Sequence, residues 1–336
     1  MTVHFDHLVV IGASAGGVTA LLEISEGLPR FFGAPVCIVQ HIGSNASLLP
    51  ELLRYKGPNH AMHAEDGQRL ATGTLHIAPP DQHMLVQGEV LHVRRGPKEN
   101  HARPAIDPLF RSAAAAHGPR VIGVVLTGQM DDGTAGLKAI KECGGITIVQ
   151  DPTTALESSM PRSALANVDV DYCVPLAEIA PLLVRLVGER SPAPAEGVPE
   201  HVQREVSINQ GEGTVEKLEG IATPSLLTCP DCGGGLWEMK DQKPLRYRCH
   251  TGHAYGALSL QAAQKESAEH ALWSTVRALR EREILLRRLA GIAAATGDSA
   301  QASAGQAQAD RLSRQIETLQ ELAETAPAGI EHDADA

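Results

Sequence analysis

Residues 8–17, Leu-Val-Val-Ile-Gly-Ala-Ser-Ala-Gly-Gly, decide the fold of this chain of 336 residues. An uninterrupted apolar run that ends in glycine is typical of a parallel strand buried on both faces. After the glycines, apolar residues recur at helical spacing, at positions 18, 21, 22 and 28. The stretch therefore predicts a buried strand, a tight turn and a helix in direct succession.

The same alternation continues to about residue 190. Apolar runs predict further strands at 36–39, 75–78, 121–126 and 146–149, and helical patterns cover 109–117, 133–143 and 177–187. Short runs on either side of Gly88 predict a small hairpin. Strands that alternate with helices predict an α/β fold. We expect a doubly wound, mostly parallel sheet with helices on both faces, in a domain of residues 1–190.

The turn after the first strand has the composition of a reactive loop. Gly12-Ala13-Ser14-Ala15-Gly16 fits the G-x-S-x-G pattern, in which a sharp strand-to-helix turn exposes a serine nucleophile. Backbone N–H groups near Ala15, at the start of the helix, are placed to bind an oxyanion. A phosphate-binding loop for a nucleotide fits the same residues, as does a plain tight turn. The motif alone leaves these three interpretations open.

Two more polar side chains follow strands. His41 comes directly after the strand at 36–39, and Asp132 follows the strand at 121–126. Alone, such a histidine is more often structural, and the acids at 131 and 132 fit a helix cap or magnesium ligands. The carboxyl ends of parallel strands, however, meet at one edge of a sheet. Ser14, His41 and Asp132 together therefore indicate a nucleophile, a base and an orienting acid.

Five segments resemble the catalytic domain of the CheB chemotaxis protein-glutamate methylesterases, in that family's order along residues 5–188. They are IGASAGG (11–17), VQHIG (39–43), IAPPDQHML (77–85), RPAIDPLFRSAA (103–114) and VVLTGQMDDGTAGL (124–137). The resemblance assigns Ser14, His41 and Asp132 to the triad, with Asp132 rather than Asp131 in the position of the family's aspartate. It implies no cofactor for catalysis.

The resemblance also implies a substrate. Family members hydrolyse glutamate methyl esters on the signalling helices of methyl-accepting chemoreceptors and release methanol, and some deamidate receptor glutamines. Members from the best-known chemotaxis systems begin with a phosphorylatable receiver domain. This sequence begins at the first catalytic strand, so we expect a stand-alone form that is regulated by another route.

Two details of the sequence concern the walls of the cleft. Gln129-Met130-Asp131 stands where the family pattern has Met-Gly-x before its aspartate, which changes the cleft next to the triad. Arg103, Asp107 and Arg111 fit either a rim that contacts the receptor helix or a polar network at a helix N-terminus. The sequence leaves both interpretations open.

A compact Cys/His module follows at residues 224–258. Cys229-Pro-Asp-Cys232 and Cys249-His-Thr-Gly-His253 supply four ligands for a tetrahedral structural zinc ion, in the manner of a zinc ribbon. His250 competes with His253 for the fourth position, and we favour His253 because its spacing allows a turn. A reduced, metal-free loop and a redox pair are the alternatives.

The remaining segments are assigned by composition. Residues 191–223, rich in Pro, Glu, Gly and Ser, are expected to form a linker. Helical spacing predicts a helical hairpin at 259–325, before an acidic tail at 326–336. A net charge of -11 argues against nucleic acid as a partner. No signal peptide or membrane span is apparent, so we expect a cytoplasmic protein without membrane insertion.

Two other functions remain as alternatives to the esterase. One is a catalytically silent signalling module of the same fold, which docks a regulatory protein through the C-terminal module. The other is a nucleotide-binding oxidoreductase built on the loop at 12–17. The second alternative predicts a Tyr-x-x-x-Lys pair, which the sequence lacks.

Overall fold

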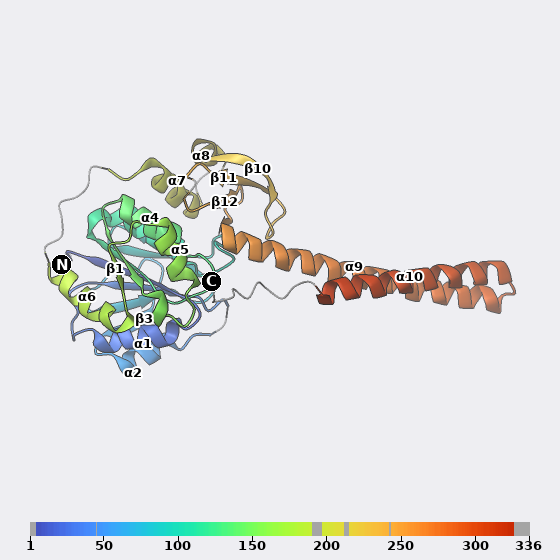
Figure 1. Ribbon diagram of the computed structural model, residues 1–336, viewed down its shortest axis with the longest axis horizontal. Helices are drawn as coiled ribbons and strands as arrows, with labels where there is room; N and C mark the ends of the chain where they lie inside the picture. Colours follow the sequence, from blue (N-terminus) through green and yellow to red (C-terminus); the bar gives the residue numbers. More distant parts are fainter. Residues whose placement is uncertain (1–4, 45, 190–196, 212–214, 242, 326–336) are drawn as a thin grey trace. The chain divides into compact units, whose positions relative to one another are not determined.

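The computed structural model describes residues 5–44, 46–189, 197–211, 215–241 and 243–325. The chain divides into two compact units, residues 1–261 and 262–336. The first unit holds the α/β domain and the Cys/His module, and the second holds most of the helical hairpin (Figure 1). None of the described helices combines the length and the apolar character needed to cross a bilayer.

A seven-stranded parallel sheet forms the centre of the first unit. Its strand order is β3-β4-β2-β1-β7-β8-β9. The strands are β1 (Leu8–Ala13), β2 (Val36–Gln40), β3 (His60–His63), β4 (Thr74–Ile77), β7 (Val121–Val125), β8 (Ile146–Gln150) and β9 (Tyr172–Val174). After β1 the chain adds β2, then the edge strand β3, and inserts β4 between β2 and β3; it then returns to add β7, β8 and β9 on the other side of β1. This confirms the doubly wound sheet.

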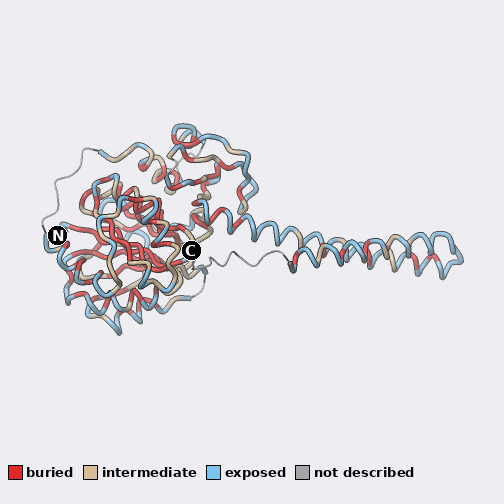
Figure 2. The backbone as a smooth tube through the Cα atoms, in the orientation of Figure 1, coloured by how far each residue is buried: buried red, intermediate tan, exposed pale blue. Residues whose placement is uncertain are grey.

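Helices cover both faces of this sheet because its strands are apolar on both sides. On one face pack α1 (Gly17–Gly27), α2 (Leu49–Lys56) and α6 (Leu176–Gly188), and on the other α3 (Ile106–His117), α4 (Thr134–Glu142) and α5 (Ser159–Asn167). Along β1, Leu8 and Val10 enter one core while Val9 and Ile11 enter the other. Figure 2 shows these strands as a buried layer.

Smaller elements complete the domain. The predicted hairpin is present as β5 (His83–Gln87) and β6 (Val90–Arg94), which turn at Gly88 with φ 57°. Short helical turns follow at η1 (Gly118–Arg120) and η2 (Pro152–Thr154). The edge strands β3 and β9 and the helices α2 and α5 were not predicted. The sequence of β3, His-Ala-Met-His, lacks the apolar run that marks a central strand.

The segment predicted as a linker, residues 191–223, is largely helical in its described part. It contains α7 (Glu200–Asn209) and α8 (Val215–Ile221). On α7, Val202, Glu205 and Ile208 are buried on one face. The buried face includes an acid in place of a third apolar residue, so the apolar periodicity that predicts helices is interrupted. Residues 191–196 and 212–214 lie outside the described residues.

The Cys/His module is a four-stranded antiparallel sheet. It comprises β10 (Ala222–Thr228), β11 (Gly235–Met239), β12 (Arg246–Cys249) and β13 (Ala254–Gly256), paired in that order. Its contacts with the neighbouring helices are few: Ala222 and Met239 pack with Ile208 of α7 and with Leu218 and Ile221 of α8. A module with so small a core needs other sources of stability.

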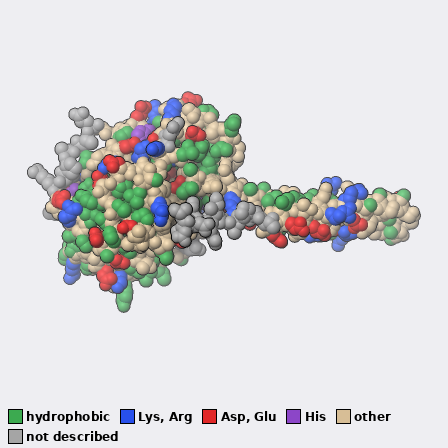
Figure 3. Space-filling model, in the orientation of Figure 1, with side chains coloured by type: hydrophobic (Ala, Val, Ile, Leu, Met, Phe, Trp, Pro, Cys, Tyr) green, Lys and Arg blue, Asp and Glu red, His purple; other side chains and the backbone are tan. Residues whose placement is uncertain are grey.

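Helices α9 (Ala257–Ala295) and α10 (Ser299–Thr325) form the predicted hairpin. Figure 3 shows charged side chains of both signs along it. Glu283 pairs with Arg280 and Arg287, and Arg287 reaches across to Asp310 on α10. Arg280 and Arg287 of α9 are therefore paired with acids of the hairpin. The predicted acidic tail, 326–336, lies outside the described residues.

Buried ion pairs join the module to the α/β domain. Glu99 contacts Arg111 of α3 and Arg248 of β12, and Glu205 of α7 contacts Arg246, Arg248 and Arg111. Burial alone would raise the pKa of Glu205, but the three guanidinium groups outweigh burial and the opposing charge of Glu99. They hold the pKa of Glu205 at about 2.

Glu205→Gln is expected to lower the free energy of unfolding by about 3–5 kcal/mol at pH 7, because Arg246 loses its ion pair and the buried Arg111 and Arg248 each lose one acidic partner. A carboxylate with a depressed folded-state pKa stabilises the fold above its unfolded-state pKa, and this contribution is lost as the pH falls through the folded value. The cost of the substitution should therefore be largest above pH ~5 and shrink as the pH falls toward ~2.

Urea unfolding across this pH range measures the effect. The matched control is Glu200→Gln on the same helix, where an exposed carboxylate pairs with Arg204. Its expected cost is under about 1 kcal/mol. Equal costs for the two variants, or a cost for Glu205→Gln that does not vary with pH, would contradict the assignment of a buried ionised Glu205.

Candidate active site

Ser14 lies on a sharp turn between β1 and α1. Its N–H donates to the carbonyl of Thr127 (3.0 Å), and its own carbonyl accepts from the N–H of Gly17 (2.9 Å). Gly16 has φ 77°, in the left-handed region, and lets the chain pass directly from strand to helix. The serine is therefore partly exposed at the N-terminus of α1, where the helix dipole favours negative charge.

His41 follows the neighbouring strand β2. Its N–H donates to the carbonyl of Ala13 (3.1 Å), which continues the pairing of β2 with β1. The side-chain amide of Gln40 donates to the carbonyls of Ser14 (2.8 Å) and His41 (3.2 Å), and so ties the two loops together. The imidazole Nδ1 of His41 lies 3.1 Å from Ser14 Oγ.

Asp132 completes the chain of contacts from the other side of β1. Its Oδ2 lies 2.7 Å from His41 Nε2. The carboxylate also accepts hydrogen bonds from the backbone N–H groups of Ile106 (2.7 Å), Asp107 (3.2 Å) and Gly133 (2.9 Å) and from the side-chain amide of Asn100 (2.7 Å). The three side chains predicted from the sequence are thus brought together in one row.

The electrostatics of Asp132 favour its charged form. Burial alone would raise the pKa of this carboxyl, but the hydrogen bond and charge of His41, the N–H of Ile106 and the amide of Asn100 outweigh burial and lower it. An ionised carboxylate in contact with the imidazole fixes the orientation of the ring and stabilises its protonated form. The imidazole faces the serine through Nδ1 and the acid through Nε2, the reverse of the serine-protease arrangement.

The absence of a side chain at Gly128 leaves the space that Ser14 occupies. A Cβ at residue 128 would lie 2.8 Å from Ser14 Cβ and 2.1 Å from Met160 Sδ. We expect Gly128→Ala to displace the serine and lower the rate of ester hydrolysis about 100-fold, since a shift of about 1 Å in a reacting group has that order of effect. Gly188→Ala is the control, because a Cβ there meets nothing within 4 Å. Equal rates for the two variants would show that the serine tolerates the shift.

The departures at residues 129–131 have structural counterparts. Met130 adopts φ 62°, a left-handed conformation that suits the glycine of the family pattern, and its carbonyl accepts from the hydroxyl of Ser159 (3.0 Å). Asp131 does not face His41. Its carboxylate accepts from the backbone N–H groups of Leu258 (3.1 Å) and Ser259 (3.2 Å), at the start of α9. Burial raises the pKa of Asp131.

Arg103, Asp107 and Arg111 fitted either a receptor-binding rim or a polar network at a helix N-terminus. Asp107 and Arg111 belong to a buried polar network. Asp107 and Arg111 are buried, and Asp107 accepts from the N–H of Gly136 and the amide of Asn100 (2.9 Å). Burial, followed by the nearby charge of Asp132, raises the pKa of Asp107 to about 7. Arg103 is held by Asp81 and by the carbonyl of Gly96. The structure therefore favours the polar network over the receptor-binding rim for Asp107 and Arg111.

The predicted metal ligands also converge. The ligand atoms of Cys229, Cys232, Cys249 and His253 lie within 4.8 Å of one another. His250, the competing ligand, is exposed and lies against Gly234 instead. The second group of close potential ligands, Glu142, His201 and Asp241, is an ion-pair cluster in which Lys138 contacts Asp241 and Glu142.

Sequence reasoning missed Asn100. This residue is buried, has φ 50°, and its amide joins the carboxylates of Asp107 and Asp132. Asparagine is among the few residues that enter the left-handed region readily. An asparagine just before the RPAID segment was the available signal, but the sequence alone gives no reason to pair it with Asp132.

Residues 9–183 match the family model described as CheB methylesterase. The chain belongs to the CheB methylesterase family. It is 41% identical over 184 residues to a Leptospira interrogans protein, a match that covers 53% of this chain and 93% of that protein. It is 38% identical over 182 residues to the protein-glutamate methylesterase FrzG of Myxococcus xanthus, with 54% of each chain covered.

A solved structure extends this comparison to three dimensions. The CheB methylesterase catalytic domain of Thermotoga maritima matches with a TM-score of 0.53 and 32% sequence identity, over 55% of this chain and all of that domain. The CheB match therefore accounts for the α/β domain. The chain spans about half the length of FrzG and of a 42% identical Geobacillus kaustophilus protein-glutamate methylesterase/protein-glutamine glutaminase.

Proposed function

We propose that this protein hydrolyses methyl esters of glutamate side chains on chemoreceptor signalling helices, with Ser14 as the nucleophile. The observation that carries the proposal is the continuous row Ser14 Oγ, His41 and Asp132, at 3.1 and 2.7 Å, within a CheB methylesterase domain. A serine, an imidazole and a buried carboxylate in contact are the groups that acyl transfer requires.

The chemistry follows from the positions of these groups. His41 Nδ1 accepts the proton of Ser14 as Oγ attacks the ester carbonyl, and Asp132 stabilises the imidazolium. Backbone N–H groups at the start of α1 stabilise the oxyanion. The imidazolium then protonates the departing methoxide, which leaves as methanol, and His41 activates a water molecule that hydrolyses the acyl-enzyme to glutamate and free Ser14.

A second activity at the same site is glutamine deamidation. Relatives such as the Geobacillus kaustophilus protein bear the name protein-glutamine glutaminase together with protein-glutamate methylesterase. An amide substrate passes through the same acyl-enzyme and releases ammonia instead of methanol. The proposed setting is the cytoplasm, where receptor signalling helices lie, and the proposed regulator is a protein that docks on the C-terminal module.

The test uses the full chain and a receptor signalling fragment in two forms, one with methylated glutamates and one with glutamines. We expect methanol release from the first form and ammonia release from the second, with the product glutamates located by peptide mass spectrometry. A fluorophosphonate probe in parallel reports whether Ser14 is reactive. Labelling of Ser14 without methanol release would reject the receptor ester as substrate, and absence of both would favour the catalytically silent module.

A further inference from the structure

The Cys/His module places four ligands at the spacing of a zinc tetrahedron. The Sγ atoms of Cys232 and Cys249 are 3.8 Å apart, and Cys249 Sγ lies 3.5 Å from His253 Nδ1. In a tetrahedron with Zn–S bonds of about 2.3 Å and Zn–N bonds of about 2.0 Å, neighbouring sulfurs are about 3.8 Å apart and sulfur and nitrogen about 3.5 Å. The donor set of three thiols and one imidazole is a usual structural zinc set.

Two tight turns hold these ligands. Cys229 exchanges backbone hydrogen bonds with Gly233 and Gly234 (2.8 and 2.7 Å), and Cys249 does so with Gly252 and His253 (3.0 and 2.9 Å). The hydroxyl of Thr251 lies 2.9 Å from Cys249 Sγ and 3.2 Å from Cys232 Sγ, where it can donate to a thiolate. Hydroxyl donors to coordinated sulfur are typical supports of a metal site.

The strand that follows His253 is attached to the α/β domain. The N–H of Asn100 donates to the carbonyl of Ala254 (2.8 Å), and the N–H of Ala254 donates to the carbonyl of Lys98 (3.4 Å). One residue before Cys249, Arg248 pairs with Glu99. Both halves of the second turn are therefore anchored to the loop at residues 98–100.

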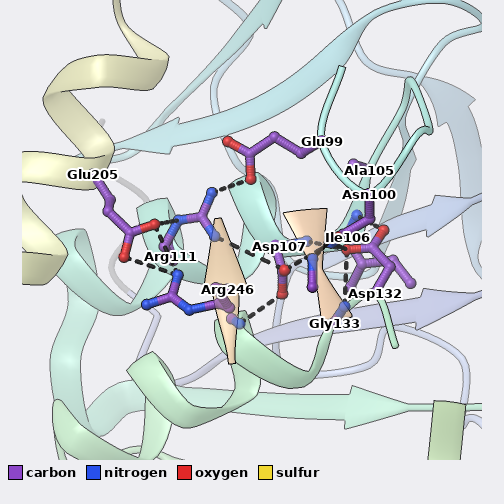
Figure 4. A network of polar contacts seen from close by, with 12 residues as sticks. Glu99, Asn100, Ala105, Ile106, Asp107, Arg111, Asp132, Gly133, Glu205 and Arg246 are labelled. Carbon is purple, nitrogen blue, oxygen red and sulfur yellow. Dashed lines mark hydrogen bonds and ion pairs between the residues drawn. The ribbon is translucent and has the colours of Figure 1, made fainter. Parts of the chain in front are cut away.

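That loop supports the acid of the triad. The amide nitrogen of Asn100 donates to Asp132 Oδ1 (2.7 Å), while its amide oxygen accepts from the N–H of Gly256 (2.7 Å) and the hydroxyl of Ser259 (3.0 Å). The adjacent Asp131 accepts from the N–H groups of Leu258 and Ser259. Figure 4 shows Asn100 beside Asp132, and Arg111 between Glu99 and Glu205.

We propose that Cys229, Cys232, Cys249 and His253 bind a zinc ion, and that this ion maintains the active position of Asp132 through β13 and the positioning residue Asn100. The part of the proposal that concerns zinc is independent of the reaction. The part that concerns Asp132 rests on the proposed function, and Ser14 labelling tests it without a receptor substrate.

Metal content is the first test. The purified full chain is expected to hold about one zinc ion per chain, and Cys232→Ser is expected to lose it. Cys173→Ser is the matched control, because Cys173 is an exposed thiol in β9, outside the cluster. A wild-type chain that neither retains zinc on purification nor takes it up from added zinc chloride would overturn the proposal.

The rate of fluorophosphonate labelling is the second test. Removal of zinc from the full chain by a chelator is expected to slow labelling of Ser14 by about 10- to 100-fold, by displacement of Asp132, and added zinc should restore it. Unchanged labelling after verified zinc loss would overturn the link to Asp132. If zinc controls labelling but no methanol is released from receptor, the proposed substrate fails and this inference stands.

Gly256→Ala tests the link while all four ligands remain. A Cβ at residue 256 would lie 2.1 Å from Asp131 Oδ2, so either the Asp131 carboxylate or β13 must move, which disturbs the contacts of this carboxylate with Leu258 and Ser259. The variant is expected to keep its zinc and to lose labelling by a similar factor. A variant with normal zinc and normal labelling would contradict the link.

Asn100→Asp separates positioning from general stability. The new carboxylate still accepts from Gly256 and Ser259, but it donates to Asp132 only when protonated. It also lies next to Asp107, the second acid that contacts residue 100. The labelling rate of the variant relative to wild type should therefore rise as the pH falls. A ratio that does not vary with pH would reject Asn100 as a positioning residue.

Discussion

Replacement of Ser14 by alanine is expected to lower the rate of ester hydrolysis by about 10⁴- to 10⁶-fold, to the residual level that substrate binding and the oxyanion site alone provide. The hydroxyl is the group that forms the acyl-enzyme, and a methyl group in its place leaves His41 without a proton to accept. The measurement is methanol release from the methylated receptor fragment under single-turnover conditions, with fluorophosphonate labelling in parallel.

Ser207→Ala is the control for this change, because that serine lies in α7 and is not among the residues that contact His41. Its rate should match wild type. If Ser14→Ala still released methanol within about tenfold of the wild-type rate, a loss far below that of a serine triad, another nucleophile would have to be sought, even if the receptor ester were the substrate.

Asp132→Asn is expected to lower the rate by about 10⁴-fold. Oδ1 of Asp132 accepts three hydrogen bonds, from Asn100, Asp107 and Gly133, so the carbonyl oxygen of an asparagine is held at that position. Its NH₂ group then faces His41 Nε2. The imidazole must accept there and carry its proton on Nδ1, against Ser14 Oγ, which is the tautomer that cannot act as base.

Steady-state kinetics distinguish this effect from a loss of binding. The variant should lose kcat with little change in KM, because Asp132 is buried and acts through its contact with His41. Circular dichroism and urea unfolding establish that the variant is folded. A folded Asp132→Asn protein that keeps more than about a tenth of the wild-type kcat, where a triad acid contributes about 10⁴-fold, would remove Asp132 from the proposed triad.

The position of the site could be predicted from the sequence because Ser14, His41 and Asp132 each lie at or shortly after the end of a strand. Apolar runs are a local signal, and parallel strands place their carboxyl ends together whatever their order. For Ser14 and His41, the strand ends sufficed once the two residues were considered together as a nucleophile and its base. Asp132 needed the family pattern as well, since the neighbouring Asp131 satisfies the same local rule and is distinguished only by its contact with the start of α9.

What could not be predicted depends on contacts between distant segments. Glu205 interrupts the apolar face of α7, and its partners Arg246 and Arg248 lie 41 and 43 residues later, so the helix was interpreted as a linker. Asn100 lies 32 residues from the carboxylate that it supports. Neither pairing leaves a periodic trace in the sequence, because a single buried ion pair or hydrogen bond has no repeat.

Because the sheet is doubly wound, the three contacting side chains Ser14, His41 and Asp132 come from both halves of the sheet. Ser14 and His41 follow β1 and β2, whereas Asp132 comes from the loop after β7, on the opposite side of β1. A slip of about 1 Å between β1 and β7 would break the row and strain the hydrogen bonds that join these two strands, while the pairing of β1 with β2 and of β7 with β8 remained. The rate of the reaction therefore depends on the alignment of β1 with β7. Mild denaturant should inactivate the protein before its circular dichroism changes.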